Sequence, residues 1–167
     1  MDERLCISSK PLIFGRFRTD IKFSHKWKSG SDPPRFDLRM EETFQCGPWS
    51  LKCRINPVYC HRTAFLAFLE GGFRKEETYF YLKCLAYSSG TYADRIYAYE
   101  RGAPGTFSVP AYYGKGGAFS LLHMRRLFIG KSSLKVYVGA NYTIRAQGER
   151  IKKLNKLTCG FACVLDI

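Results

Sequence analysis

The stretch Thr-Tyr-Phe-Tyr-Leu-Lys-Cys-Leu-Ala, from Thr78 to Ala86, carries the clearest fold signal in the sequence. Phe80 and Leu82 stand in one phase of this stretch, whereas Lys83 stands in the other. Successive side chains of a β-strand point to opposite faces, so residues two apart share a face. The alternation therefore predicts a strand with two unlike faces, and the following Ser88-Ser89-Gly90 predicts a hairpin turn.

Similar patterns recur on both sides of this stretch. Strands are predicted near residues 21–26, 49–55, 65–69, 95–99, 106–112 and 134–144. Between the last two, apolar residues from Phe119 to Phe128 recur at near-helical spacing, which predicts one short helix or turn, and Gln147 to Leu157 fits an amphipathic helix. These elements together predict an all-β fold, an antiparallel β-sandwich of about seven or eight strands with one short helix.

Composition and charge limit the classes of protein to which the chain can belong. Its 167 residues are 46% hydrophobic and 16% aromatic, which excludes a disordered chain and indicates one domain with a real core. There are 27 Lys and Arg against 14 Asp and Glu, a net charge of +13 that attracts anionic partners. Nucleic acid, an acidic protein surface and a generic solvated exterior all remain open. Outside the cluster from Arg150 to Lys156, the basic residues are spread along the chain.

The cysteines indicate a reducing compartment. Their number is seven, which is odd, and the residues after Met1 lack the apolar run of a signal peptide. No stretch approaches the roughly 20 apolar residues of a membrane span. We therefore expect a cytoplasmic or nuclear protein that makes no membrane contact. Cys46, Cys53 and Cys60 are spaced too widely for a zinc knuckle and are interpreted as buried structural thiols.

The sequence offers little material for catalysis. Catalytic triads combine a nucleophile, a base and an orienting acid, but the histidines are only His25, His61 and His123, and the carboxylates are scattered. We expect a protein that is not an enzyme and has no metal and no cofactor.

Six stretches, taken in order, resemble the MATH domain, the TRAF-like β-sandwich of speckle-type substrate adaptors. They are Ile21–Trp27, Trp49–Pro57, Ala64–Leu69, Tyr79–Gly90, Gly117–Phe119 and Ser133–Tyr137. The first is similar to the family's opening strand, hydrophobic-x-Phe-Ser-x-x-Trp, and the second to its Trp-x-Leu-basic strand. Gly117 stands where the family usually has the tryptophan of Trp-Gly-Phe.

The resemblance implies a domain organisation. It covers residues 20–146 as a MATH-like β-sandwich, preceded by an N-terminal extension over residues 1–19 and followed by a basic tail over residues 147–167. In the adaptors a BTB domain commonly follows and recruits a cullin-RING ubiquitin ligase. Such a domain would be a partner of this chain only if the chain is a fragment of a longer one.

The resemblance also implies a function and a site. MATH domains of this kind capture extended, often Ser/Thr-rich peptide segments across a sheet face, with aromatic pockets reading alternate side chains. By motif position the peptide-binding residues are Phe68, Phe80, Tyr97 and Phe119. Core packing is the competing interpretation of Phe80, because a Phe on an alternating strand is more often buried than exposed.

The alternative function is that of a basic nucleic-acid-binding β domain. It would use Arg125, Arg126, Lys131 and the cluster from Arg150 to Lys156. Steep loss of binding with salt is the mark of such a protein, because each phosphate contact releases counterions. A third alternative is a scaffold without any groove.

Overall fold

The computed structural model describes residues 2–8, 15–26, 34–102, 107–129, 132–146 and 154–166. About four fifths of them form antiparallel β-strands, which confirms the all-β prediction. The main sheet has nine strands, β1 (Asp2–Ser8), β2 (Arg16–Lys26), β3 (Arg35–Cys46), β4 (Trp49–Tyr59), β5 (Thr63–Lys75), β6 (Thr78–Ser88), β9 (Lys115–Ile129), β10 (Ser132–Ala146) and β11 (Leu154–Asp166). A second, two-stranded sheet consists of β7 (Ile96–Tyr97) and β8 (Ala111–Tyr112).

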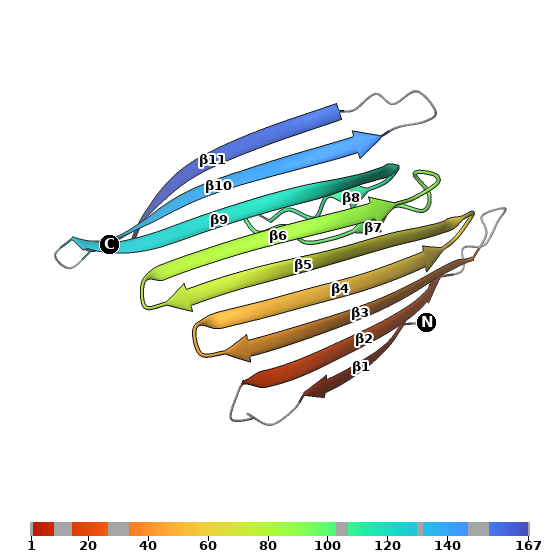
Figure 1. Ribbon diagram of the computed structural model, residues 1–167, viewed down its shortest axis with the longest axis horizontal. Coiled ribbons are helices and arrows are strands. Elements are labelled where there is room, and N and C mark those ends of the chain that lie inside the picture. Colours follow the sequence, from red (N-terminus) through yellow and green to blue (C-terminus); the bar gives the residue numbers. More distant parts are fainter. Residues whose placement is uncertain are drawn as a thin grey trace.

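The main sheet is a meander. Each of its strands pairs with the next along the chain, except that β6 pairs with β9 (Figure 1). Between those two strands the chain leaves the sheet and forms β7 and β8, which lie against one face. The turn between β3 and β4 needs Gly47, whose φ of 54° lies in the left-handed region that glycine adopts at no steric cost. The predicted strand around Thr78–Ala86 falls within β6.

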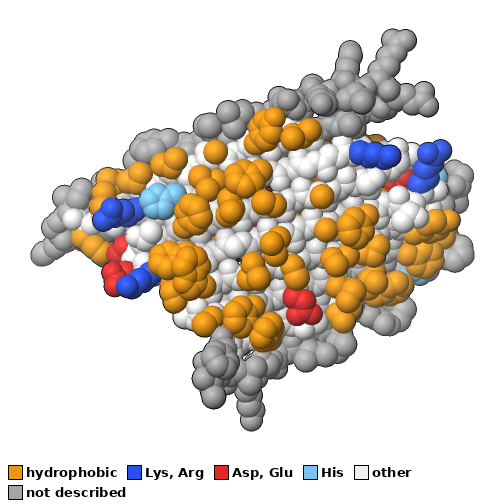
Figure 2. All heavy atoms as spheres, in the orientation of Figure 1, with side chains coloured by type: hydrophobic (Ala, Val, Ile, Leu, Met, Phe, Trp, Pro, Cys, Tyr) orange, Lys and Arg blue, Asp and Glu red, His pale blue; other side chains and the backbone are white. Residues whose placement is uncertain are grey.

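The two faces of the main sheet have opposite chemistry. We call the face that carries β7 and β8 the covered face and the other the open face. On β4, Arg54, Asn56 and Val58 are buried on the covered face, whereas Leu51 and Ile55 are exposed on the open face. The strand pairing extends this alternation in register from β2 to β10. Hydrophobic side chains consequently spread over the open face, with few charges among them (Figure 2).

The core lies between the covered face and the segment that contains β7 and β8. Leu66, Phe68 and Leu85 come from the sheet, and Ile96 and Tyr112 from the covering segment. This two-stranded layer is much smaller than the sheet beneath it, so the second layer covers only the middle strands of the main sheet.

The short helix predicted over Phe119–Phe128 is wrong, because these residues belong to the 15-residue strand β9. Short apolar runs do not distinguish a helix from a strand by spacing alone. Here β9 is hydrogen-bonded to β6 on one side and to β10 on the other, and this pairing decides the outcome. Leu154 to Leu157, at the end of the predicted amphipathic helix, begin β11, and residues 147–153 lie outside the described residues.

The interpretation of the cysteines as buried structural thiols is also wrong for those whose side chains are described. Cys46 and Cys84 are exposed, and Cys53 and Cys60 are half-buried. Three of them share the phase of the open face, which no other layer of the described chain covers. Within the described ranges, no helix is long and apolar enough to cross a membrane.

Candidate functional site

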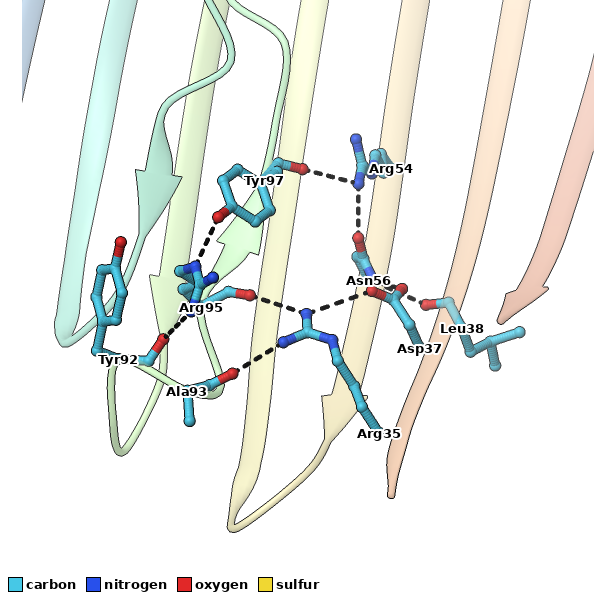
Figure 3. Close-up of polar contacts among 9 residues, drawn as sticks. All are labelled: Arg35, Asp37, Leu38, Arg54, Asn56, Tyr92, Ala93, Arg95 and Tyr97. Atoms are coloured by element: carbon cyan, nitrogen blue, oxygen red, sulfur yellow. Dashed lines mark hydrogen bonds and ion pairs between the residues drawn. The ribbon is translucent and has the colours of Figure 1, made fainter. Parts of the chain in front are cut away.

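A cleft of about 690 Å³ opens on the covered face, between β2–β4 and the segment that precedes β7. It is rich in cations. Its lining residues are Lys22, Ser24, Lys26, Arg35, Asp37, Arg39, Arg54, Asn56, Cys60, His61, Tyr92, Ala93, Arg95 and Tyr97. We call it the basic cleft, and Figure 3 shows the polar contacts within it.

Strand alternation and register bring the cations of the cleft together. Lys22 pairs with Arg39, and Lys26 pairs with Arg35, across the β2–β3 ladder. Since residues two apart on a strand share a face, each of these cations points to the covered face. Arg54 on β4 stands in the same phase. Three neighbouring strands therefore present Lys and Arg side chains at the same end of the sheet.

The single carboxylate that lines the cleft is already engaged by its neighbours. Asp37 Oδ1 accepts a hydrogen bond of 2.7 Å from Asn56 Nδ2, and Asp37 Oδ2 lies 3.5 Å from Arg35 Nη2. Asn56 also donates to the Leu38 carbonyl at 3.0 Å and accepts from Arg54 Nη2 at 2.6 Å. Against six Lys and Arg side chains in the lining, this one acid leaves the cleft strongly positive.

Arginines join the sheet to the covering segment. Arg35 donates to the carbonyls of Ala93 and Arg95 at 3.0 and 2.8 Å, and Arg54 donates to the Tyr97 carbonyl at 3.1 Å (Figure 3). Hydrogen bonds from charged donors are worth about 1.5–3 kcal/mol each. They fix the wall of the cleft in place, so the site is formed before any ligand arrives.

The loop at the mouth of the cleft is organised by a buried acid. Asp94 is fully buried, and its Oδ1 accepts backbone N–H bonds from His61 at 3.0 Å and Arg62 at 3.3 Å. Its Oδ2 accepts from the Thr91 hydroxyl at 2.7 Å. Burial alone would raise the pKa of Asp94, but the hydrogen bonds from Thr91, Arg62 and His61 outweigh it, and the pKa is lowered.

Two tyrosines of the cleft are held by Arg95. Its Nε donates to the Tyr97 hydroxyl at 2.6 Å, and its guanidinium carbon lies 4.4 Å from the Tyr92 ring centroid and 5.6 Å from that of Tyr97. The hydrogen bond to Tyr97 raises the pKa of Arg95. This cluster places phenol and guanidinium groups side by side along one wall.

Arg54 lies at the inner end of the cleft, where its surroundings disfavour its positive charge. Burial, with a contribution from the nearby Arg39 cation, lowers its pKa to about 10. Among the described residues, no group accepts a hydrogen bond from its Nε, although that atom is buried. An anionic ligand at this point would compensate both the charge and the unpaired donor.

The structure divides the four residues predicted to bind peptide between the two faces. Tyr97 lines the basic cleft and is 45% exposed. Phe68 points to the same face but is only 9% exposed, because it packs in the core beneath the Lys83 ammonium, 4.4 Å from its ring centroid. Phe80 and Phe119 lie on the open face, 38% and 43% exposed, so core packing does not describe Phe80.

The residues expected of the nucleic-acid alternative are not gathered together either. Arg125 points to the open face and Arg126 to the covered face, because they are neighbours on β9. Lys131 and residues 150–153 lie outside the described residues. The cations that do gather are those of β2, β3 and β4, and their shared phase in three strands is the signal in the sequence that would have identified them.

The described residues contain no group of three or more His, Cys, Asp or Glu side chains placed to hold a metal ion. No protein-family model, curated protein or solved structure matches the chain. The resemblance to MATH domains therefore stays a prediction, and the argument for function rests on the basic cleft.

Proposed function

We propose that this protein is a protein-binding module that captures an extended, acidic segment of a partner protein in the basic cleft. The observation that carries the proposal is the lining itself, with six Lys and Arg side chains and one carboxylate that is already bound by Arg35 and Asn56. A volume of about 690 Å³ lies within the range of sites for small or short ligands.

The aromatic side chains of the cleft favour a peptide over a nucleic acid. Proteins that bind single strands stack bases on available aromatic rings beside a positive groove. In this cleft Arg95 already lies over the rings of both Tyr92 and Tyr97. What the cleft offers is a set of guanidinium and ammonium donors, which suit the carboxylates of Asp and Glu side chains.

The test is fluorescence anisotropy with a labelled, extended Ser/Thr-rich peptide that carries several Asp and Glu residues. The double variant Lys22→Gln/Arg39→Gln removes two cations of the lining, which lie opposite each other on the β2–β3 ladder. We expect its affinity to fall about tenfold or more, since each 1.4 kcal/mol of lost binding is a factor of ten. Tyr97→Ala is also expected to weaken binding, because it removes an aromatic side chain that lines one wall of the cleft.

Two matched controls separate the cleft from general charge and from the open face. Lys75→Gln/Arg125→Gln removes the same number of positive charges from the open face, at the ends of the strands far from the cleft, and Phe119→Ala changes an aromatic on the open face. Both are expected to bind the peptide as the unmodified protein does. Loss of binding in Phe119→Ala, or none in Lys22→Gln/Arg39→Gln, would contradict the proposal.

A second peptide and a nucleic acid complete the design. In the matched peptide every Asp and Glu is replaced by Asn and Gln, and we expect it to bind far more weakly. Single-stranded RNA that binds more tightly than the acidic peptide, with a steep dependence on salt, would favour the nucleic-acid alternative. The wider setting implied by the resemblance, substrate capture for a cullin-RING ligase, is part of the proposal only if acidic, Ser/Thr-rich segments bind.

A further inference from the structure

The open face of the main sheet is an extended apolar surface. On β2–β6, β9 and β10 most of its described side chains are hydrophobic, and Glu42 is the one acid among them. The Glu42 carboxylate accepts a hydrogen bond of 2.8 Å from Thr19 on the neighbouring strand. The cations on this face, Lys75, Lys115 and Arg125, stand at or near the ends of their strands. The centre of the face therefore carries no cation (Figure 2).

This surface is too large to be an ordinary exposed patch. With strands about 4.8 Å apart and about 3.3 Å per residue, seven strands of some eleven residues cover roughly 1,200 Å². The largest apolar patch on a typical monomer is about 300–600 Å². A stable protein–protein interface buries about 800 Å² on each partner. The open face is therefore large enough to form a complete interface.

Small and large side chains occupy separate rows on this face. One row across the strands holds only small residues, Ala67, Ala86 and Gly117, paired in register on β5, β6 and β9. These residues form the floor of a shallow hollow of about 550 Å³, and Ile55 and Ile144 close its two ends. We call this row the small-residue row.

A second row, with large rings, lies six residues away on the same three strands. It consists of Phe73, Phe80 and His123, which pair in register across β5, β6 and β9. Trp49 extends the row onto β4, with its ring centroid 4.7 Å from that of Phe73. We call this row the aromatic row.

We propose that two copies of this chain pack through their open faces as a symmetric dimer, with the aromatic row of each copy in the small-residue row of the other. A twofold axis between the sheets, parallel to the rows and midway between them, brings Phe80 over the partner copy's Ala86 and Phe73 over its Ala67. The same operation makes the reciprocal contacts, as an isologous interface requires. Two sheets packed in this way form an aligned β-sandwich about 10 Å thick.

The same geometry gives the dimer a characteristic dependence on salt. The twofold axis places Lys115 of one copy opposite Arg125 of the other at the rim, where their repulsion is screened by ions. We expect the dimer to become tighter as salt is added, whereas peptide binding in the basic cleft becomes weaker. The two surfaces can therefore be distinguished in one salt titration.

The test is sedimentation velocity of the full chain over a range of concentrations. We expect a species of twice 19.2 kDa, and in Phe80→Lys a dissociation constant at least about tenfold larger, because an unpaired ammonium would be buried in each half of the interface. Gln45→Lys adds the same charge at an exposed position on the covered face and should leave the dimer intact. Thermal unfolding of each variant confirms that it is folded.

A charge-pair experiment tests the register itself. Ala86→Glu alone is expected to dissociate the dimer, as Phe80→Lys does, but an equal mixture of the two variants should form a mixed dimer. In that dimer the introduced ammonium meets the introduced carboxylate, and the other half of the interface is unchanged. A chain that stays monomeric would overturn the proposal, even if it bound lipid vesicles. So would a dimer that Phe80→Lys leaves unaffected, or a mixture that does not associate.

Discussion

The two faces of the main sheet come from the same strands, yet the face with more charge is the one that is covered. On the covered face Arg35, Arg54 and Lys83 donate to backbone carbonyls of the covering segment, and Arg101 donates to Glu70. Charged groups tolerate burial when they are hydrogen-bonded. The open face has almost no such groups, so only apolar contact can cover it. The polar groups of the covered face are therefore satisfied by hydrogen bonds within the chain, whereas the apolar open face is buried by contact between two chains.

The largest effect that separates the faces is expected from one pair of leucines on β5. Leu66 is fully buried on the covered face, and Leu69 is 52% exposed on the open face. In the Phe80→Lys background, which removes association, Leu66→Ala should lower the free energy of unfolding by about 2–5 kcal/mol because it leaves a cavity. Leu69→Ala should lower it by less than about 1 kcal/mol. Urea denaturation measures both, and equal losses would contradict the assignment of the core to the covered face.

A smaller effect is expected from the buried acid at the mouth of the cleft. Asp94→Asn removes the charge that strengthens the hydrogen bonds from Thr91, His61 and Arg62, and should destabilise the protein by about 1–3 kcal/mol. The pKa of Asp94 is lowered in the folded state. Its contribution is therefore complete above its unfolded pKa of about 3.9 and is lost as the pH falls through the lower folded pKa.

The measurement is the free energy of unfolding as a function of pH for the unmodified protein and for Asp94→Asn. The variant should lose less stability than the unmodified protein as the pH falls below about 4. Identical acid dependence of the two proteins would show that Asp94 does not contribute in this way. The open face offers no counterpart, because its one described carboxylate, Glu42, is exposed.

The smallest effect compares two adjacent glycines of β5 that point to opposite faces. A Cβ at Gly71, on the open face, would meet no atom within 4 Å, whereas at Gly72 it would collide with the Ser50 hydroxyl and the Tyr81 ring. Gly71→Ala should therefore stabilise the protein by a few tenths of a kcal/mol, since it restricts the unfolded chain. Gly72→Ala should destabilise it. Thermal unfolding in the Phe80→Lys background measures the change in stability for each variant. If both substitutions stabilised the protein, or both destabilised it, the difference between the faces would be contradicted.

The sequence predicts the strands well where one face is buried and the other exposed. Alternation from Thr78 to Ala86 identified β6, and the alternation around Trp49 identified β4. Alternation gave the wrong prediction at Phe119–Phe128, because β9 has apolar residues in both phases and its spacing therefore does not distinguish a strand from a helix. Pairing with β6 and β10 determines the strand there. The long meander itself depends on pairing between strands, which no local pattern encodes.

The candidate site was harder to predict than the fold. Tyr97 was identified and lines the basic cleft, but its Lys and Arg residues come from three strands. Alternation places the cations of each strand on one face, but the register of β2, β3 and β4 is needed to bring the three strands' cations together. Phe68 and Phe119 were grouped with Tyr97, yet the covering segment that buries Phe68 and leaves Phe119 open has no distinctive pattern in the sequence.

One measurement tests most directly the claim that the two faces act separately. It is sedimentation velocity detected through a fluorescent acidic peptide mixed with the chain. We expect the peptide to sediment with a species of twice 19.2 kDa in the unmodified protein, with a monomer in Phe80→Lys, and free in Lys22→Gln/Arg39→Gln. A peptide that sediments free in the unmodified protein, or that is released by Phe80→Lys, would contradict the account.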